Sequence, residues 1–313
     1  MQGGSHVNEI TAMLPEPIRQ HILDLPPHVL QQMEEIRIRI SKRVEVTAAG
    51  KPVFLSCIAT HQDGITLLSE LSQYSIYALE EELKRGFITI QGGHRVGLSG
   101  RVITENGRVK AIRNVTSFNI RVARQKRGIA DRFIPCCYSG EWLNTMIIGP
   151  PQTGKTTMLR DFARIMSTGH GQIPSRKVGI VDERSEIAGC INGIPQHEFG
   201  ERVDVLDACP KAEGMMMMIR SMSPDVLVVD EAGRMEDTEA ILEAVHAGVG
   251  LFISVHGCSL EDIKMRPTIA PLLNHHVFKR FIELSRVSGP GTVQRVIDEE
   301  GRIVRTEEGV PLC

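Results

Sequence analysis

The sequence predicts an α/β protein in which a domain with a mostly parallel sheet follows a smaller α+β domain. After about residue 143, short apolar runs alternate with segments of helical periodicity, which is typical of a parallel sheet covered on both faces. Before residue 125, strands with alternating polar and apolar residues surround an Asn106-Gly107 turn, which predicts hairpins. The 313 residues are enough for two domains of ordinary size.

The N-terminal α+β domain is predicted to span residues 1–125. Its elements are expected in this order: helices over 15–23 and 27–33, a strand over 34–40, a hairpin over 42–55, a helix over 69–87 and a strand-rich stretch over 88–122. A charged and then proline-containing stretch at 126–142 is predicted to be a linker.

The C-terminal α/β domain is predicted to span residues 143–313. Buried strands are expected at TMIIG (145–149), VGIVD (178–182), DVLVVD (225–230) and GLFISVH (250–256). Helical segments lie between these runs, and MMMM at 215–218 falls in one of them. We interpret the four methionines as apolar packing and not as a metal site.

Composition narrows the classes of partner. The formal net charge is -2, aromatic residues make up 4% and one Trp is present, so no nucleic acid is expected as a partner. No apolar run approaches the roughly 18–20 residues that span a bilayer, and the N-terminus does not resemble a secretory signal. We therefore expect a cytoplasmic protein that is peripheral at a membrane through partners.

A glycine-rich loop is the strongest motif in the chain. GPPQTGKT at 149–156 fits G-x-x-x-x-G-K-[ST], with an apolar strand before it and a helix after it. This context predicts that backbone N–H groups and the helix N-terminus hold the phosphates of a nucleotide such as ATP. The expected nucleotide-binding residues are Gly149, Pro150, Pro151, Gln152, Thr153, Gly154, Lys155, Thr156 and Thr157. Lys155 is expected to reach the β- and γ-phosphates, and Thr156 to bind Mg²⁺.

A second motif predicts hydrolysis. DVLVVDEAGR (225–234) is an apolar strand that ends in two acids. Asp230 is expected to hold Mg²⁺ together with Thr156. Glu231 is expected to orient and polarise the attacking water, which hydrolysis requires and transfer to another substrate does not. A strand that ends in solvated acids is the alternative interpretation.

Two further strand ends carry polar residues. VDERSE (181–186) places Glu183 after one strand, and SVHG (254–257) places His256 at the end of another. Ligands of open α/β sheets bind at the carboxyl ends of the strands, so both residues are candidate catalytic groups. A structural role for a single histidine remains the alternative.

The order of these motifs resembles that of the type II/IV secretion ATPase superfamily. VDERSE, VVDEAGR and SVHG match its acidic box, Walker B strand and histidine box, although typical members read Gly-Glu where this chain reads Asp230-Glu231. The resemblance implies a RecA-like P-loop ATPase domain and a homo-oligomer, expected to be a hexamer. It also implies that arginines of the N-terminal domain reach the phosphates, with Arg121 as the first choice and Arg101 as a further candidate. Ordinary surface arginines on a strand remain the alternative.

One branch of that superfamily is similar over essentially the whole chain. GIVDERSEIAGCINGIPQHEFGERVDVLDACPKAEG (179–214) resembles the stage III sporulation protein AA family of endospore formers. This resemblance implies a mother-cell ATPase that works with integral membrane proteins of a channel complex between mother cell and forespore. A RecA-like nucleic-acid-dependent ATPase and a nucleotide-gated scaffold remain as alternatives.

Overall fold

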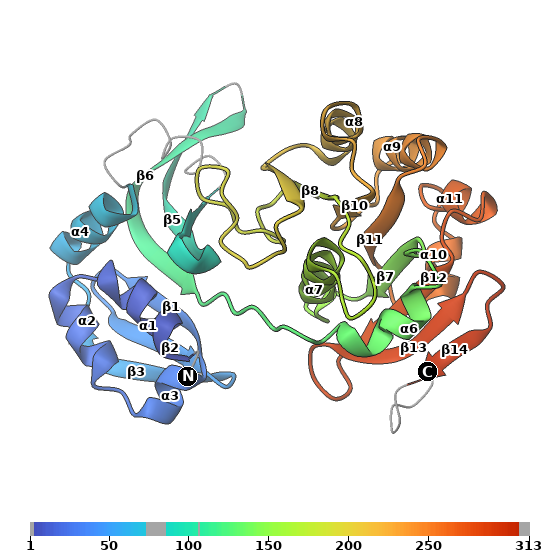
Figure 1. Cartoon of the computed structure of the whole chain (residues 1–313). Coiled ribbons are helices and arrows are strands. Elements are labelled where there is room, and N and C mark those ends of the chain that lie inside the picture. The colour runs from blue at the N-terminus through green and yellow to red at the C-terminus, as the bar shows by residue number, and fades with distance from the viewer. Residues whose placement is uncertain (1–2, 73–85, 106, 307–313) are drawn as a thin grey trace. The chain divides into compact units, whose positions relative to one another are not determined.

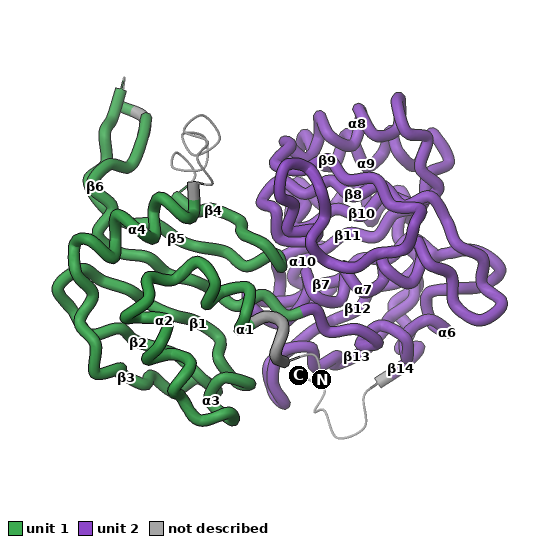
Figure 2. Tube along the Cα trace, turned by 60° about the vertical axis from the view of Figure 1, so that its left-hand side comes forward, with its two compact units in different colours: residues 1–124 green, residues 125–313 purple. Residues whose placement is uncertain are grey.

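A computed structural model describes residues 3–72, 86–105 and 107–306. The chain divides into two compact units, residues 1–124 and residues 125–313 (Figure 2). Each unit has its own sheet and its own buried core, so each is described by itself.

Unit 1 is built on a six-stranded antiparallel sheet of order β3-β2-β1-β6-β5-β4. The strands are β1 (Met33–Arg39), β2 (Arg43–Ala48), β3 (Lys51–Ile58), β4 (Phe87–Ile90), β5 (His94–Glu105) and β6 (Arg108–Arg121). The helices are α1 (Gly3–Ala12), α2 (Glu16–Leu23), α3 (Pro27–Gln31), α4 (His61–Ser72) and the short η1 (Gln91–Gly93).

Alternation along the strands explains the core of unit 1. In β1, Met33, Ile36 and Ile38 are buried, and they pack with Ile18 and Ile22 of α2. The predicted helix at 69–87 overlaps the end of α4, and its remainder, 73–85, lies outside the described residues. Asn106 of the expected turn also lies outside them.

Unit 2 is a mixed α/β fold with an eight-stranded, mostly parallel sheet of order β14-β13-β12-β7-β11-β10-β8-β9 (Figure 1). The six strands from β12 to β9 pair in parallel, and β13 and β14 add antiparallel pairs at one edge. The strands are β7 (Thr145–Gly149), β8 (Val178–Asp182), β9 (Val203–Asp207), β10 (Val226–Val229), β11 (Gly250–His256), β12 (Arg280–Ser285), β13 (Thr292–Asp298) and β14 (Ile303–Thr306). The mostly parallel sheet agrees with the prediction.

Helices cover both faces of this sheet. One face packs against α7 (Lys155–Thr168), and Ile147 and Phe252 point to it from the strands. The other face packs against α8 (Lys211–Met222) and α9 (Met235–His246), with α10 (Leu260–Lys264) and α11 (Ala270–Asn274) beside them. Burial on both faces explains why the strands read as continuous apolar runs.

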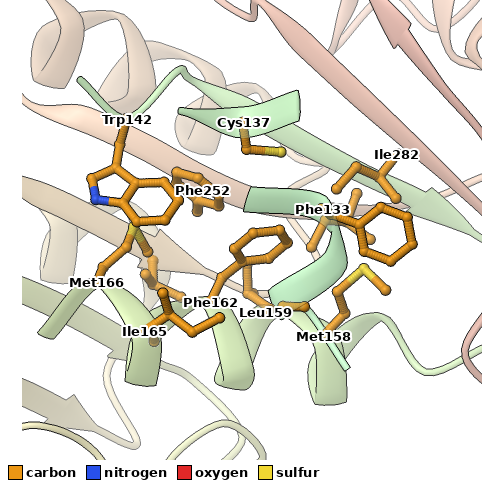
Figure 3. Close-up of a cluster of buried hydrophobic side chains, with 14 of the residues drawn as sticks. Phe133, Cys137, Trp142, Met158, Leu159, Phe162, Ile165, Met166, Phe252 and Ile282 are labelled. Carbon is orange, nitrogen blue, oxygen red and sulfur yellow. The ribbon is translucent and has the colours of Figure 1, made fainter. Parts of the chain in front are cut away.

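The stretch predicted as a linker, 126–142, is part of the core of unit 2. It forms η2 (Asp131–Phe133) and α6 (Ile134–Cys137), and it buries Phe133, Cys137 and Trp142. Trp142 packs edge-to-face with the rings of Phe162 and Phe252, at centroid distances of 6.5 and 5.9 Å (Figure 3). The linker prediction is therefore wrong for most of this stretch. The charged residues and Pro135 of this stretch obscure its apolar residues, which pack against α7.

Candidate active site

The carboxyl ends of four neighbouring strands bring the sequence motifs together. Strands β7, β11, β10 and β8 are adjacent and parallel, so the residues that follow them meet at one edge of the sheet. The phosphate loop follows β7, His256 ends β11, Asp230 and Glu231 follow β10, and Glu183 follows β8.

The loop at 149–156 is shaped by its two glycines. Gly154 has φ 95°, in the left-handed region, and directly precedes the 14-residue helix α7. A Cβ at Gly149 would lie 2.5 Å from Oγ1 of Thr153, so no larger residue fits there without displacing that side chain. The loop therefore brings its backbone close to the N-terminus of α7, where an anion is stabilised by free N–H groups and the helix dipole.

Lys155 is buried and folded back onto its own loop. Its Nζ donates to the carbonyl oxygens of Gly149 at 2.8 Å and Pro150 at 3.0 Å. A third bond runs to Nδ1 of His256 at 3.1 Å. Burial lowers the pKa of Lys155, although the charges of Asp230 and Glu231 act in the opposite direction. The ammonium group is thus held by neutral acceptors beside two carboxylates.

Asp230 connects the phosphate loop to two strand ends. Its Oδ2 accepts a hydrogen bond from Thr156 at 2.6 Å, and its Oδ1 accepts one from Ser254. The same Ser254 oxygen accepts from the backbone N–H of Glu231 at 2.9 Å.

Sequence reasoning missed Ser254, a buried polar residue in the apolar run of β11 and two positions before His256. That spacing puts both residues on one face of the strand, which is the signal that could have found it.

Glu231 is held between two basic side chains. Its carboxylate lies 2.9 Å from a guanidinium nitrogen of Arg184 and 2.8 Å from Nε2 of His256. Because Lys155 donates to Nδ1, the ring proton of His256 belongs on Nε2, which then donates to Glu231. Glu231 also has φ 54°, an uncommon value for a residue with a Cβ, and such backbone conformations cluster at functional sites.

The acidic segment after β8 has two separate roles. Glu183 pairs with Lys211, the first residue of α8, at 2.7 Å. Burial raises its pKa, but the bond to Lys211 together with the positive charges of Lys211, Arg234 and Arg184 holds the pKa of Glu183 below its usual value. Asp182 is buried and accepts backbone bonds from Glu186, Ile187 and Ala188 at 2.8–2.9 Å. Asp182 therefore shapes the segment, and Glu183 projects from it.

Asp182 gives a prediction about pH. Burial raises its pKa from 3.8 to about 6, against the lowering effect of its backbone donors. A carboxyl with a higher pKa in the folded than in the unfolded chain favours folding most when protonated. Its contribution therefore falls as the pH rises from about 4 to about 6, and is constant above. We expect the free energy of unfolding of wild type, relative to Asp182→Asn, to fall by about 2 kcal/mol over that window.

Urea denaturation at pH 4 and pH 6.5 measures this difference. Trp142 is the single tryptophan and lies in the core of unit 2, so its fluorescence follows that unit alone. Glu201→Gln, at an exposed carboxylate of unit 2, is the control. Parallel stability profiles for wild type and Asp182→Asn would contradict the raised pKa.

The remaining predicted residues are placed as follows. Thr157 lies in the first turn of α7, and Thr153 donates to the carbonyl of Pro150 at 2.8 Å. Arg286 after β12 donates to the carbonyl of Pro151 and, at 2.7 Å, to the side chain of Gln152. Arg286 thus stabilises the exposed side of the loop through these two hydrogen bonds.

The two predicted arginines lie in unit 1, not in the unit that holds the residues above. Arg121 ends β6 and is exposed, with Glu35 at 3.9 Å, and Arg101 pairs in register with Arg113 across β5 and β6. Their predicted role in catalysis stays a prediction.

The arrangement fits a magnesium–nucleotide complex. Thr156 and Asp230 present a hydroxyl and a carboxylate oxygen at the N-terminus of α7, and hard oxygen donors are what Mg²⁺ prefers. Within the described residues, no group of three or more His, Cys, Asp or Glu side chains could hold a metal alone. Mg²⁺ in P-loop sites takes the rest of its ligands from phosphate and water.

The family model for sporulation stage III, protein AA matches residues 5–304. The chain belongs to that family. It is 57% identical over 307 residues to stage III sporulation protein AA of Bacillus subtilis (strain 168), covering 98% of this chain and 100% of that protein. An uncharacterized protein, ycf45, of Porphyra purpurea is 24% identical over 265 residues, covering 82% of this chain and 41% of that protein.

Solved structures of secretion-type ATPases share the fold of this family member. The pilus retraction motor PilT with bound ADP aligns at a TM-score of 0.58 and 15% identity, covering 86% of this chain and 76% of that one. The Legionella pneumophila ATPase DotB aligns at a TM-score of 0.56 and 16% identity, covering 80% and 72%. Among the described residues, no helix is both long and apolar enough to cross a bilayer.

Proposed function

We propose that the protein is a Mg²⁺-dependent ATP hydrolase that acts as a secretion-type motor during endospore formation. The observation that carries this proposal is the meeting of the phosphate loop, Asp230 and Glu231 at one sheet edge, with Thr156 bonded to Asp230. A GTPase or a small-molecule kinase does not need the second acid, whereas an ATP hydrolase uses it to orient water. Fold similarity to PilT and DotB supports the same class.

The residues of the phosphate loop have defined tasks in this proposal. Backbone N–H groups between Gly149 and Thr156 bind the phosphates, and Lys155 exchanges the carbonyls of Gly149 and Pro150 for phosphate oxygens. Thr156 and Asp230 hold Mg²⁺, which supplies charge neutralisation on the phosphate oxygens. Gly154 permits the phosphates to approach the backbone closely at the start of α7.

Glu231 takes the role of general base. Its present partners, Arg184 and His256, neutralise and position its carboxylate. When Lys155 turns to the phosphates, Nδ1 of His256 loses its hydrogen-bond donor. The Nδ1 edge of the ring can then turn toward the γ-phosphate while Nε2 stays near Glu231. We also propose a catalytic role for Glu183, which is paired with Lys211, beside Glu231 and His256. Arg121 and Arg101 are proposed to contribute positive charge to the transferring phosphoryl group.

The setting of the motor follows from its family. We propose a RecA-like P-loop domain preceded by an α+β domain, assembled into a homo-oligomer that is a hexamer. The motor works in the mother-cell cytoplasm and reaches the membrane through integral membrane proteins of a channel complex between mother cell and forespore. Closure of the N-terminal domain over ATP, and its release after hydrolysis, would deliver the stroke.

Phosphate release from ATP, measured with and without Mg²⁺ and with and without DNA, tests the proposal. We expect release that depends on Mg²⁺ and is unchanged by DNA. A rate equal to that of Lys155→Ala under every condition would overturn the hydrolase assignment. Strong stimulation by DNA would instead favour a nucleic-acid-dependent ATPase.

Assembly gives a separate prediction. With ATP and Mg²⁺, multi-angle light scattering is expected to show a species of about six times the 34.7 kDa chain mass. Nucleotide stabilises the ring if it binds the assembled form more tightly than the monomer. A strict monomer at high protein concentration, with ATP and Mg²⁺ present, would contradict the hexamer.

A further inference from the structure

A groove between α8 and α9 lies outside the site described above, on the outer side of these two helices. Its volume is about 750 Å³. Met216 and Met217 of α8 contribute its apolar floor, and Arg220 lies near one end. Of the four consecutive methionines, Met215 and Met218 are buried, whereas Met217 is 53% exposed. The helix therefore uses half of this run for the core and presents part of the rest to the groove.

Carboxylates form the opposite wall of the groove. Glu236, Glu239 and Glu243 of α9 are spaced i, i+3, i+7, which aligns them along one face of the helix. All three are exposed, and within the described residues none of them forms an ion pair. Like charges at this spacing repel each other and destabilise a helix. A cationic partner along this wall removes that cost.

The shape and charge of the groove select its occupant. A groove between two helices suits a third helix, whose side chains fit between those of the pair. The 12 residues of α8 extend over about 18 Å, so about three turns of a helix fit along it. A wall of carboxylates repels nucleic acid and anionic lipid. Methionine side chains adapt to varied apolar partners.

The described helices of this chain do not supply such a partner. Apart from α7 and α8, each described helix carries at most one Lys or Arg. The cations of α7 are largely buried, and Lys211 of α8 is tied to Glu183. We propose that the α8–α9 groove binds a helix of a partner protein with apolar residues on one face and Lys or Arg along its edge.

The groove also touches the elements that position the candidate site. Lys211, which pairs with Glu183, is the first residue of α8. α9 begins four residues after Glu231, and Asp237 in its first turn accepts bonds from the backbone of Gly233 and Arg234 at 3.0 Å. An occupant of the groove therefore contacts the helix that pairs with Glu183 and the helix whose first turn binds the backbone just after Glu231. The binding itself does not depend on the proposed ATPase function.

Fluorescence anisotropy with three labelled 16-residue peptides tests the proposal on the full chain. The first is an amphipathic Leu/Lys helix, the second a scrambled peptide of the same composition, and the third an amphipathic Leu/Glu helix. We expect only the Leu/Lys helix to bind. Glu236→Gln/Glu239→Gln/Glu243→Gln should weaken it about tenfold, as the loss of three rim charge pairs would. Replacing the three glutamates by lysine should move binding to the Leu/Glu helix.

A matched control separates groove binding from general attraction to an acidic protein. Glu70→Gln/Glu141→Gln/Glu201→Gln removes the same charge from exposed sites outside the groove and should leave the affinity unchanged. Equal weakening by both triple variants, or equal binding of the scrambled peptide, would overturn the proposal. A third outcome would also overturn it: no peptide binds to wild type, and the groove variant without peptide has a different oligomeric mass from wild type. The groove would then bind a second copy of this chain. Lys155→Ala should bind the peptide as wild type does, which keeps this test separate from ATP turnover.

Discussion

Replacing Lys155 by alanine is expected to reduce ATP turnover by roughly 100-fold or more and to weaken nucleotide binding. The ammonium group lies inside the loop, where Gly149, Pro150 and His256 hold it. Its lowered pKa reflects burial, so it gains most from an anionic partner. Binding of a fluorescent ATP analogue and phosphate release measure the two effects separately.

The control for this variant is Lys264→Ala, at an exposed lysine on α10. It removes the same charge and should keep wild-type turnover. Because Lys155 also satisfies two backbone carbonyls, Trp142 fluorescence should first confirm that unit 2 of Lys155→Ala is folded. Undiminished turnover in the folded variant would remove the phosphate loop from the proposed site.

The parallel sheet and its motifs could be predicted because their signals are local. Strands buried on both faces read as apolar runs, and β7, β8 and β11 coincide with the predicted runs at 145–149, 178–182 and 250–256. Their shared direction then brings Lys155, Glu231 and His256 to one edge. Adjacent parallel strands thus convert a one-dimensional order of motifs into a site.

The partners of these residues could not be predicted in the same way. Arg184 pairs with Glu231 across 47 residues of sequence, and Lys211 pairs with Glu183 across a segment without regular spacing. Such contacts depend on loop paths, which no periodicity encodes. The linker prediction for residues 126–142 fails for a related reason. Its buried Phe133 and Trp142 are too far apart, and too mixed with charges, to show a period.

Replacing Glu231 by glutamine is expected to leave ATP binding intact and to reduce turnover by roughly 100- to 10,000-fold. Glutamine keeps the size of the side chain and one acceptor oxygen, but it cannot take a proton from water. The substitution also removes the charge that Arg184 pairs with at 2.9 Å, so Arg184 is released. The bound nucleotide should therefore accumulate as ATP and not as ADP.

Separation of the protein from free nucleotide, followed by chromatography of what stays bound, measures this trapping. Glu201→Gln, at an exposed glutamate, is the matched control and should hydrolyse ATP at the wild-type rate. Turnover near wild type in Glu231→Gln would exclude Glu231 as the base and leave Glu183 as the next carboxylate to test. Loss of ATP binding would mean instead that Glu231 acts on the loop through His256 and Lys155, since those contacts at 2.8 and 3.1 Å form one chain. The ratio of bound ATP to ADP thus distinguishes a chemical role of Glu231 from a positioning role.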